Sequence, residues 1–94
     1  MLYNMKVRFA MGRIFEQCGL PKNPDNDLTN IIFVHGIRSY IGDAKKKKLD
    51  PDEAARHCLK ECLDFIEDSR EELLDQSPHK ALFEQIILQL KQAV

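Results

Sequence analysis

Two short stretches of this chain carry residue types that could do chemistry. His35 precedes Arg38 by about one helical turn, so the histidine could act as a general base while the arginine holds a phosphate. His57, Cys58 and Cys62 are residue types that bind zinc. These stretches raise the alternative hypotheses of a histidine-based helical nuclease and of a metal-binding protein.

Neither stretch forms a complete set of catalytic or metal-binding residues in the sequence. Cys58 and Cys62 lie one turn apart on a helix, but His57 would point roughly 100° away from Cys58. The chain has no CxxC pair and no HxxxH pair, and buried structural cysteines explain the pattern more simply. A further metal ligand would have to be one of Cys18, His35 and His79. We therefore predict no catalytic residue, no metal and no cofactor.

The acidic side chains concentrate in one segment of the chain. Residues 50–76 hold ten of the fifteen Asp and Glu residues and carry a net charge of −7. Residues 1–48 carry nine basic and four acidic side chains, a net charge of +5. Because such segregation steers association with a charged partner, it favours a small regulatory or adaptor protein that binds a macromolecule without catalysis.

A helix over residues 50–76 would place most of its acids on one face. Projected at about 100° per residue, these acids lie opposite an apolar arc that contains Leu63 and Ile66. Like charges at this spacing repel one another, and this cost favours a functional role. The face would then dock into a basic protein groove or mimic a phosphate backbone, and the alternative is a solvated face. Arg70 projects into the apolar arc, where it could anchor a partner, form a buried ion pair or reach past the helix end. The predicted partner-binding residues are Glu61, Asp64, Asp68, Arg70, Glu71, Glu72 and Asp75.

A run of four lysines, Lys45, Lys46, Lys47 and Lys48, directly precedes the acidic segment. Lysines at the end of a helix complement its dipole, but four in a row exceed that need. The second function hypothesis is therefore a nucleic-acid-binding module that contacts phosphates through this run. No aromatic residue interrupts the run, and the chain contains no known nucleic-acid-binding motif.

Leu2, Met5 and Phe9 form a second apolar stripe beside the main apolar face of residues 2–18. A helix with two apolar faces either lies between neighbouring helices or completes its core by dimerising. The stripe therefore makes a homodimer one of the predicted states of the chain.

The elements that must position these residues are four helices in a single domain over residues 1–94. Apolar periodicity predicts helices over residues 2–18, 28–47 and 50–76, and a fourth that begins at Ser77 and Pro78. Gly19 should end the first helix, and Asp50 should cap the third with Pro51 at its first position. Residues 31–34 could also form a buried strand, but no second strand is available to pair with it. The predicted fold is all-α: a small four-helix bundle-like domain with one long acidic helix at about residues 50–76, which overhangs the bundle or bends.

The composition restricts the cellular location. No stretch approaches the roughly 18 consecutive apolar residues of a membrane-spanning helix. The first residues lack the apolar run of a signal peptide, and the chain has three cysteines with no framework spacing. We therefore predict a cytoplasmic protein with no membrane contact, whose partner is a protein or, under the second hypothesis, a nucleic acid.

Overall fold

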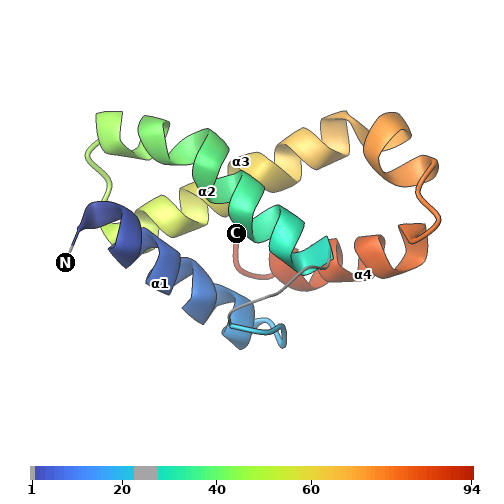
Figure 1. The fold of residues 1–94 in the computed structure, drawn as a ribbon, viewed down its shortest axis with the longest axis horizontal. Coiled ribbons are helices and arrows are strands. Elements are labelled where there is room, and N and C mark those ends of the chain that lie inside the picture. The colour runs from blue at the N-terminus through green and yellow to red at the C-terminus, as the bar shows by residue number, and fades with distance from the viewer. Residues whose placement is uncertain (1, 23–27) are drawn as a thin grey trace.

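The computed structural model describes residues 2–22 and 28–94 of the chain. These residues form four α-helices and one π-helix and contain no strand (Figure 1), so the all-α prediction is confirmed. The helices are α1 (Tyr3–Gln17), α2 (Leu28–Lys46), α3 (Pro51–Asp68), η1 (Glu71–Asp75) and α4 (Lys80–Lys91). Residues 31–34 lie inside α2, so the alternative of a buried strand is wrong.

The crossing of α2 and α3 is the centre of the molecule, because these two helices make the most extensive helix–helix contact. Helix α1 packs against α3 on one side of the crossing (Figure 1). At the other end of α3 the chain turns back through η1, and α4 runs beneath it towards the crossing. The molecule measures 39 × 24 × 22 Å along its principal axes.

Gly36 of α2 lies against α3 at the crossing of the two helices. A Cβ atom at this position would lie 3.4 Å from the carbonyl oxygen of Cys58 and 3.5 Å from Cβ of Cys62. These are ordinary van der Waals distances, so the α3 backbone packs directly against α2 at this residue.

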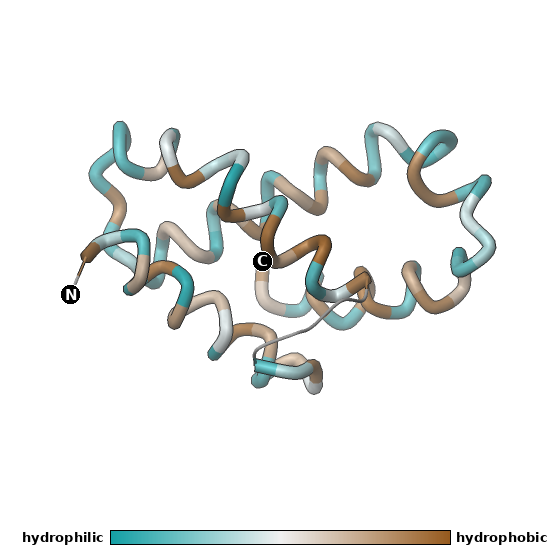
Figure 2. Tube along the Cα trace, viewed as in Figure 1, coloured by the Kyte–Doolittle hydropathy of each residue, from teal (hydrophilic) through white to brown (hydrophobic). Residues whose placement is uncertain are grey.

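One apolar core joins all five elements. Figure 2 shows apolar and polar residues alternating along each helix, as expected when one face is buried and the other is exposed. Phe15 of α1 and Phe33 of α2 meet edge to face with ring centroids 5.2 Å apart. Fully enclosed side chains come from every element: Val7, Met11, Phe15, Ile32, Cys58, Leu59, Cys62, Leu74 and Leu90.

The ends of the first three helices follow local chemistry. Gly19 adopts a φ of 81° just after α1, and Leu20 N–H donates to the Phe15 carbonyl, which confirms the predicted glycine-terminated helix end. Lys48 takes the equivalent position after α2, with a φ of 55°. Asp50 caps α3 as predicted, because its carboxylate accepts a 2.9 Å hydrogen bond from Glu53 N–H.

The acidic helix expected over residues 50–76 is interrupted. Helix α3 ends at Asp68, Ser69 leaves helical geometry at φ −107° and ψ 27°, and the chain continues as the π-helix η1. Serine competes for backbone hydrogen bonds inside helices, and carboxylates at a helix C-terminus oppose the helix dipole. Glu67, Asp68 and Ser69 therefore favour an end to α3 at this point, and of the two predicted alternatives the helix bends.

Helix α4 begins three residues later than Ser77, the predicted cap. The Ser77 hydroxyl accepts a 3.1 Å hydrogen bond from His79 N–H, so it stabilises the turn that precedes the helix. In the part of the chain that the structure describes, no helix is both long and apolar enough to cross a membrane.

Candidate functional site

An apolar cavity lies where α2, α3, η1 and α4 converge, on the side of the helix crossing away from α1. Its volume is about 270 Å³. We call it the apolar pocket, and it is lined by Ile31, Ile32, His35, Cys62, Phe65, Ile66, Leu73 and Phe83. Because the lining comes from four elements, the bend after α3 helps to create the pocket by placing Leu73 and Phe83 opposite α2.

The rim of the apolar pocket exposes large apolar side chains to solvent. Ile31 of α2 is 55% exposed, Phe65 of α3 is 42% exposed and Leu73 of η1 is 39% exposed. Apolar side chains from three separate elements thus gather around one opening. Such an exposed apolar cluster at a pocket is typical of an interaction site.

His35 is the polar residue of the apolar pocket. Its Nδ1 atom lies 3.4 Å from the Ser39 hydroxyl, and its Nε2 atom is enclosed without a hydrogen-bond partner among the described residues. The Phe65 ring lies against the imidazole with centroids 5.3 Å apart. His35, Arg38 and Ser39 also line an adjacent hollow of about 390 Å³ on α2. The histidine ring therefore lies between the apolar pocket and a hollow of mixed polar and apolar lining.

The predicted acidic face is divided between two elements. Glu61, Asp64 and Asp68 belong to α3, whereas Glu71, Glu72 and Asp75 follow the bend on η1. Asp64 pairs with Lys60 at 2.8 Å, and Asp75 pairs with Lys80 at 3.1 Å. Four carboxylates of the predicted face form no ion pair within the described residues, and we call them the acidic surface: Glu61, Asp68, Glu71 and Glu72.

Arg70 lies within a cluster of carboxylates rather than in the apolar core. The bend after Asp68 carries it towards α4, where its guanidinium forms ion pairs with Glu67, Asp75 and Glu84. Its side chain is partly exposed. The projection onto the apolar arc assumed a continuous α-helix, and the turn at Ser69 invalidates that assumption. Arg70 thus links α3, η1 and α4.

The four lysines of the run do not form one patch. Lys45 places its ammonium 5.9 Å from the centre of the Tyr3 ring on α1, while Lys47 pairs with Asp43 at 3.3 Å. Lys46 ends α2, and Lys48 occupies the left-handed position that follows it. Two of the four ammonium groups are therefore engaged within the molecule, which leaves Lys46 and Lys48 for a phosphate contact.

His57, Cys58 and Cys62 are separated by their environments. His57 Nε2 contacts the Asp43 carboxylate at 2.7 Å and so joins α3 to the end of α2. Burial raises the pKa of Cys58 to about 11 and that of Cys62 to about 12, so both thiols hold their protons near neutral pH. Among the described residues, no group of three or more His, Cys, Asp or Glu side chains is placed to hold a metal.

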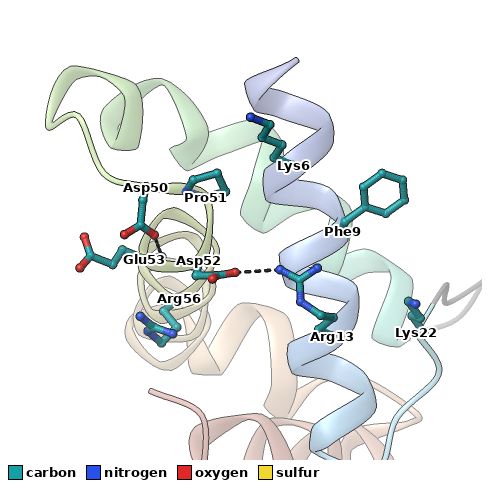
Figure 3. A pocket seen from close by; sticks show the side chains of 9 residues that line it. All are labelled: Lys6, Phe9, Arg13, Lys22, Asp50, Pro51, Asp52, Glu53 and Arg56. Carbon is teal, nitrogen blue, oxygen red and sulfur yellow. Dashed lines mark hydrogen bonds and ion pairs between the residues drawn. The ribbon is translucent and has the colours of Figure 1, made fainter. Parts of the chain in front are cut away.

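The stripe of Leu2, Met5 and Phe9 on α1 is exposed to solvent. Beside it lies a hollow of about 740 Å³ between α1 and the start of α3. Figure 3 shows the Arg13 guanidinium and the Asp52 carboxylate pointing towards each other across this hollow, 2.8 Å apart, while Phe9 points away from α3. Its α1 wall carries Lys6 and Arg13, whereas the acids Asp50, Asp52 and Glu53 line it at the start of α3, so it has no single electrostatic preference.

The sequence analysis did not identify the apolar pocket. Its only signal in the sequence is that Ile31 and Phe65 stand outside the main apolar faces of their helices. The other wall depends on the path of the chain after Asp68, which periodicity does not give. His35, the residue predicted as a possible general base, lies between the apolar pocket and the hollow that it lines together with Arg38.

Comparison of the chain with protein-family models, with curated proteins and with solved structures gave no match.

Proposed function

We propose that this chain is a small regulatory or adaptor module that binds a basic segment of another protein. The observation that carries the proposal is the position of the acidic surface beside the apolar pocket. Glu61 and Asp68 lie one helical turn on either side of Phe65, and Glu72 adjoins Leu73. Unpaired carboxylates next to exposed apolar side chains match a partner that is both basic and amphipathic.

Repulsion within the acidic surface supports a binding role. On the continuous helix α3, Glu61 and Asp68 lie three and four residues from Asp64, and such like-charge pairs destabilise a helix by about 0.2–0.5 kcal/mol each. A basic partner would relieve this repulsion on binding. Carboxylates that serve only to keep the surface solvated would be better placed beside lysines, as Asp64 is beside Lys60 at 2.8 Å.

The experiment is a peptide-display selection against the whole chain, with a matched pair of charge-reversal variants. Asp68→Lys/Glu72→Lys reverses two carboxylates of the acidic surface. Glu16→Lys/Glu53→Lys makes the same change of net charge at exposed positions elsewhere. We expect the selected peptides to be basic and amphipathic. They should bind the control variant, and they should not bind the Asp68→Lys/Glu72→Lys variant. Selected peptides that bind all three proteins equally would refute the proposal.

The proposal also includes self-association through α1. Leu2 is 74% exposed, and Met5 and Phe9 are about half exposed on the same stripe. This stripe lies on α1, whereas the acidic surface lies on α3 and η1, so a homodimer would leave the partner-binding surface open.

A further inference from the structure

We infer that the apolar pocket receives one tryptophan side chain, presented by a basic amphipathic helix of the partner. The inference rests on the proposed function, which supplies the basic character of that helix. Three properties of the pocket carry it: the volume, the chemistry of the rim, and one enclosed nitrogen atom that has no partner in the part of the chain described by the structure.

The volume suits a single large side chain. At about 270 Å³ the pocket is slightly smaller than the range of roughly 300–1,000 Å³ that is typical of sites for whole small molecules. Its lining is almost entirely apolar, from aliphatic and aromatic side chains of four elements. A buried aromatic side chain in such a pocket is the usual energetic centre of a protein–protein interface.

The rim defines the residues that should flank the tryptophan. The α3 and η1 side presents Glu61, Asp68 and Glu72 around the exposed Phe65 and Leu73. Lysine or arginine side chains one turn before and after the tryptophan would meet these carboxylates. On the α2 side the exposed Arg38 lines the adjoining hollow, where it would attract a carboxylate or the C-terminal carbonyl groups of the bound helix. The two sides of the rim thus give the bound helix one preferred direction.

The enclosed Nε2 atom of His35 favours an aromatic side chain that carries a hydrogen-bond donor over phenylalanine. When Nδ1–H donates to the Ser39 hydroxyl, Nε2 presents a lone pair inside an apolar pocket and lacks a donor. The indole of tryptophan has a single N–H donor on an otherwise apolar ring. The Phe65 ring covers the imidazole but is 42% exposed, so rotation of its side chain would open the path to Nε2.

A second copy of this chain cannot be the proposed occupant, because the sequence contains no tryptophan. Because the chain has no tryptophan, all tryptophan fluorescence in a binding experiment comes from the peptide. The probe is a synthetic basic amphipathic helical peptide with one central tryptophan. Its two controls replace the tryptophan by alanine or by 1-naphthylalanine, which keeps a fused aromatic ring but has no N–H group.

Binding is measured by fluorescence for the tryptophan peptide and by calorimetry for all three peptides. We expect the tryptophan emission to shift to the blue on binding. Compared with the tryptophan peptide, the alanine peptide should bind about tenfold or more weakly, and the naphthylalanine peptide about threefold or more weakly. On the His35→Phe variant, the tryptophan and naphthylalanine peptides should bind equally. If the naphthylalanine peptide binds the original chain as tightly as the tryptophan peptide does, the indole N–H does not donate to His35 Nε2 and that part of the inference is wrong.

Two further variants distinguish failure of this inference from failure of the proposed function. Ile31→Lys changes an exposed residue of the rim and leaves the buried core unchanged. It should weaken binding of the tryptophan peptide more than binding of the alanine peptide. The Asp68→Lys/Glu72→Lys variant should bind all three peptides more weakly than the original chain does. If the tryptophan and alanine peptides bind alike and both are lost on charge reversal, the pocket inference is wrong and the proposed function stands. If no basic peptide binds even at low salt, the proposed function is wrong.

Discussion

Lys48 shows how one residue can hold an unfavourable conformation to complete a helix end. Its N–H donates to the Lys45 carbonyl and Leu49 N–H donates to the Ala44 carbonyl, which together close the end of α2. This hydrogen-bond pattern requires a positive φ, here 55°, which a residue with a Cβ atom adopts at a cost. Gly19 occupies the same position after α1, with a φ of 81° and no such cost.

We therefore predict that Lys48→Gly stabilises the protein and Gly19→Ala destabilises it. The expected changes in the free energy of unfolding are a gain of about 0.5 kcal/mol and a loss of about 1 kcal/mol. Urea denaturation followed by circular dichroism measures both. Equal losses in the two variants would mean that the end of α2 does not carry conformational strain at Lys48.

Asp43 provides a pH-dependent link between α2 and α3. The hydrogen bond from His57, and then that from Lys47, lowers the pKa of the Asp43 carboxyl below its ordinary value of 3.8. A carboxyl group whose pKa is lower in the folded than in the unfolded state stabilises the fold when it is ionised. This contribution is fully present above the unfolded pKa and is lost as the pH falls through the lower folded pKa.

Asp43→Asn should consequently destabilise the protein near neutral pH, and its difference from the original chain should shrink as the pH falls below 3.8. Urea midpoints measured from neutral to acidic pH test this prediction. Glu16→Gln serves as the control, because the exposed Glu16 side chain forms no ion pair within the described residues. A difference for Asp43→Asn that is independent of pH would contradict the electrostatic link.

At the scale of the elements, residues at the helix ends predicted the fold except at the junction between α3 and η1. Gly19 and Asp50 each determine a helix end through their own backbone chemistry, so the sequence identified both ends correctly. The end of α3 depends on Ser69 together with the contact of Arg70 with Glu84, which is distant in the sequence. Periodicity does not reveal this contact. The sequence therefore predicts an undivided acidic face, which is wrong, and does not locate the apolar pocket.

Arg70 should hold the junction of α3, η1 and α4 through its ion pairs with Glu67, Asp75 and Glu84. We predict that Arg70→Met lowers the free energy of unfolding by less than about 1 kcal/mol, because the arginine is partly exposed and solvent screens its pairs. The local effect should be larger. The Glu72 and Leu73 amides, which donate to the Ser69 carbonyl, should exchange hydrogen faster in the variant. Unchanged exchange at these amides would mean that the π-helix forms without the arginine.

At the scale of the whole molecule, the lysine run and the acidic residues of η1 are separated along the long axis. The lysine run at the end of α2 and the acidic residues of η1 lie towards opposite ends in Figure 1, and this axis measures 39 Å. At physiological ionic strength the Debye length is about 8 Å, so salt screens the two ends from one another. The acidic surface and the lysine run should therefore act as independent sites.

This independence gives a test of the nucleic-acid hypothesis. Lys46→Gln/Lys48→Gln removes the two lysines of the run that form neither an ion pair nor a cation–π contact within the described residues. We expect the variant to bind basic peptides as the original chain does, since the acidic surface is unchanged. Fluorescence anisotropy with labelled DNA and RNA at low salt provides the comparison. Binding of nucleic acid by the original chain that the variant loses would favour the lysine run as a second functional site.

The exposed stripe of Leu2, Met5 and Phe9 determines the last prediction, which concerns assembly. Three apolar side chains cover only part of the roughly 800 Å² per partner that a stable interface buries, so we expect a weak, concentration-dependent homodimer. Sedimentation velocity over a wide range of concentration should detect it, and Met5→Lys/Phe9→Lys should remain monomeric throughout. Phe65→Lys is the control, because Phe65 is also exposed but belongs to the apolar pocket. A dimer that Phe65→Lys abolishes and Met5→Lys/Phe9→Lys does not would place self-association at the pocket, where it would compete with the basic partner.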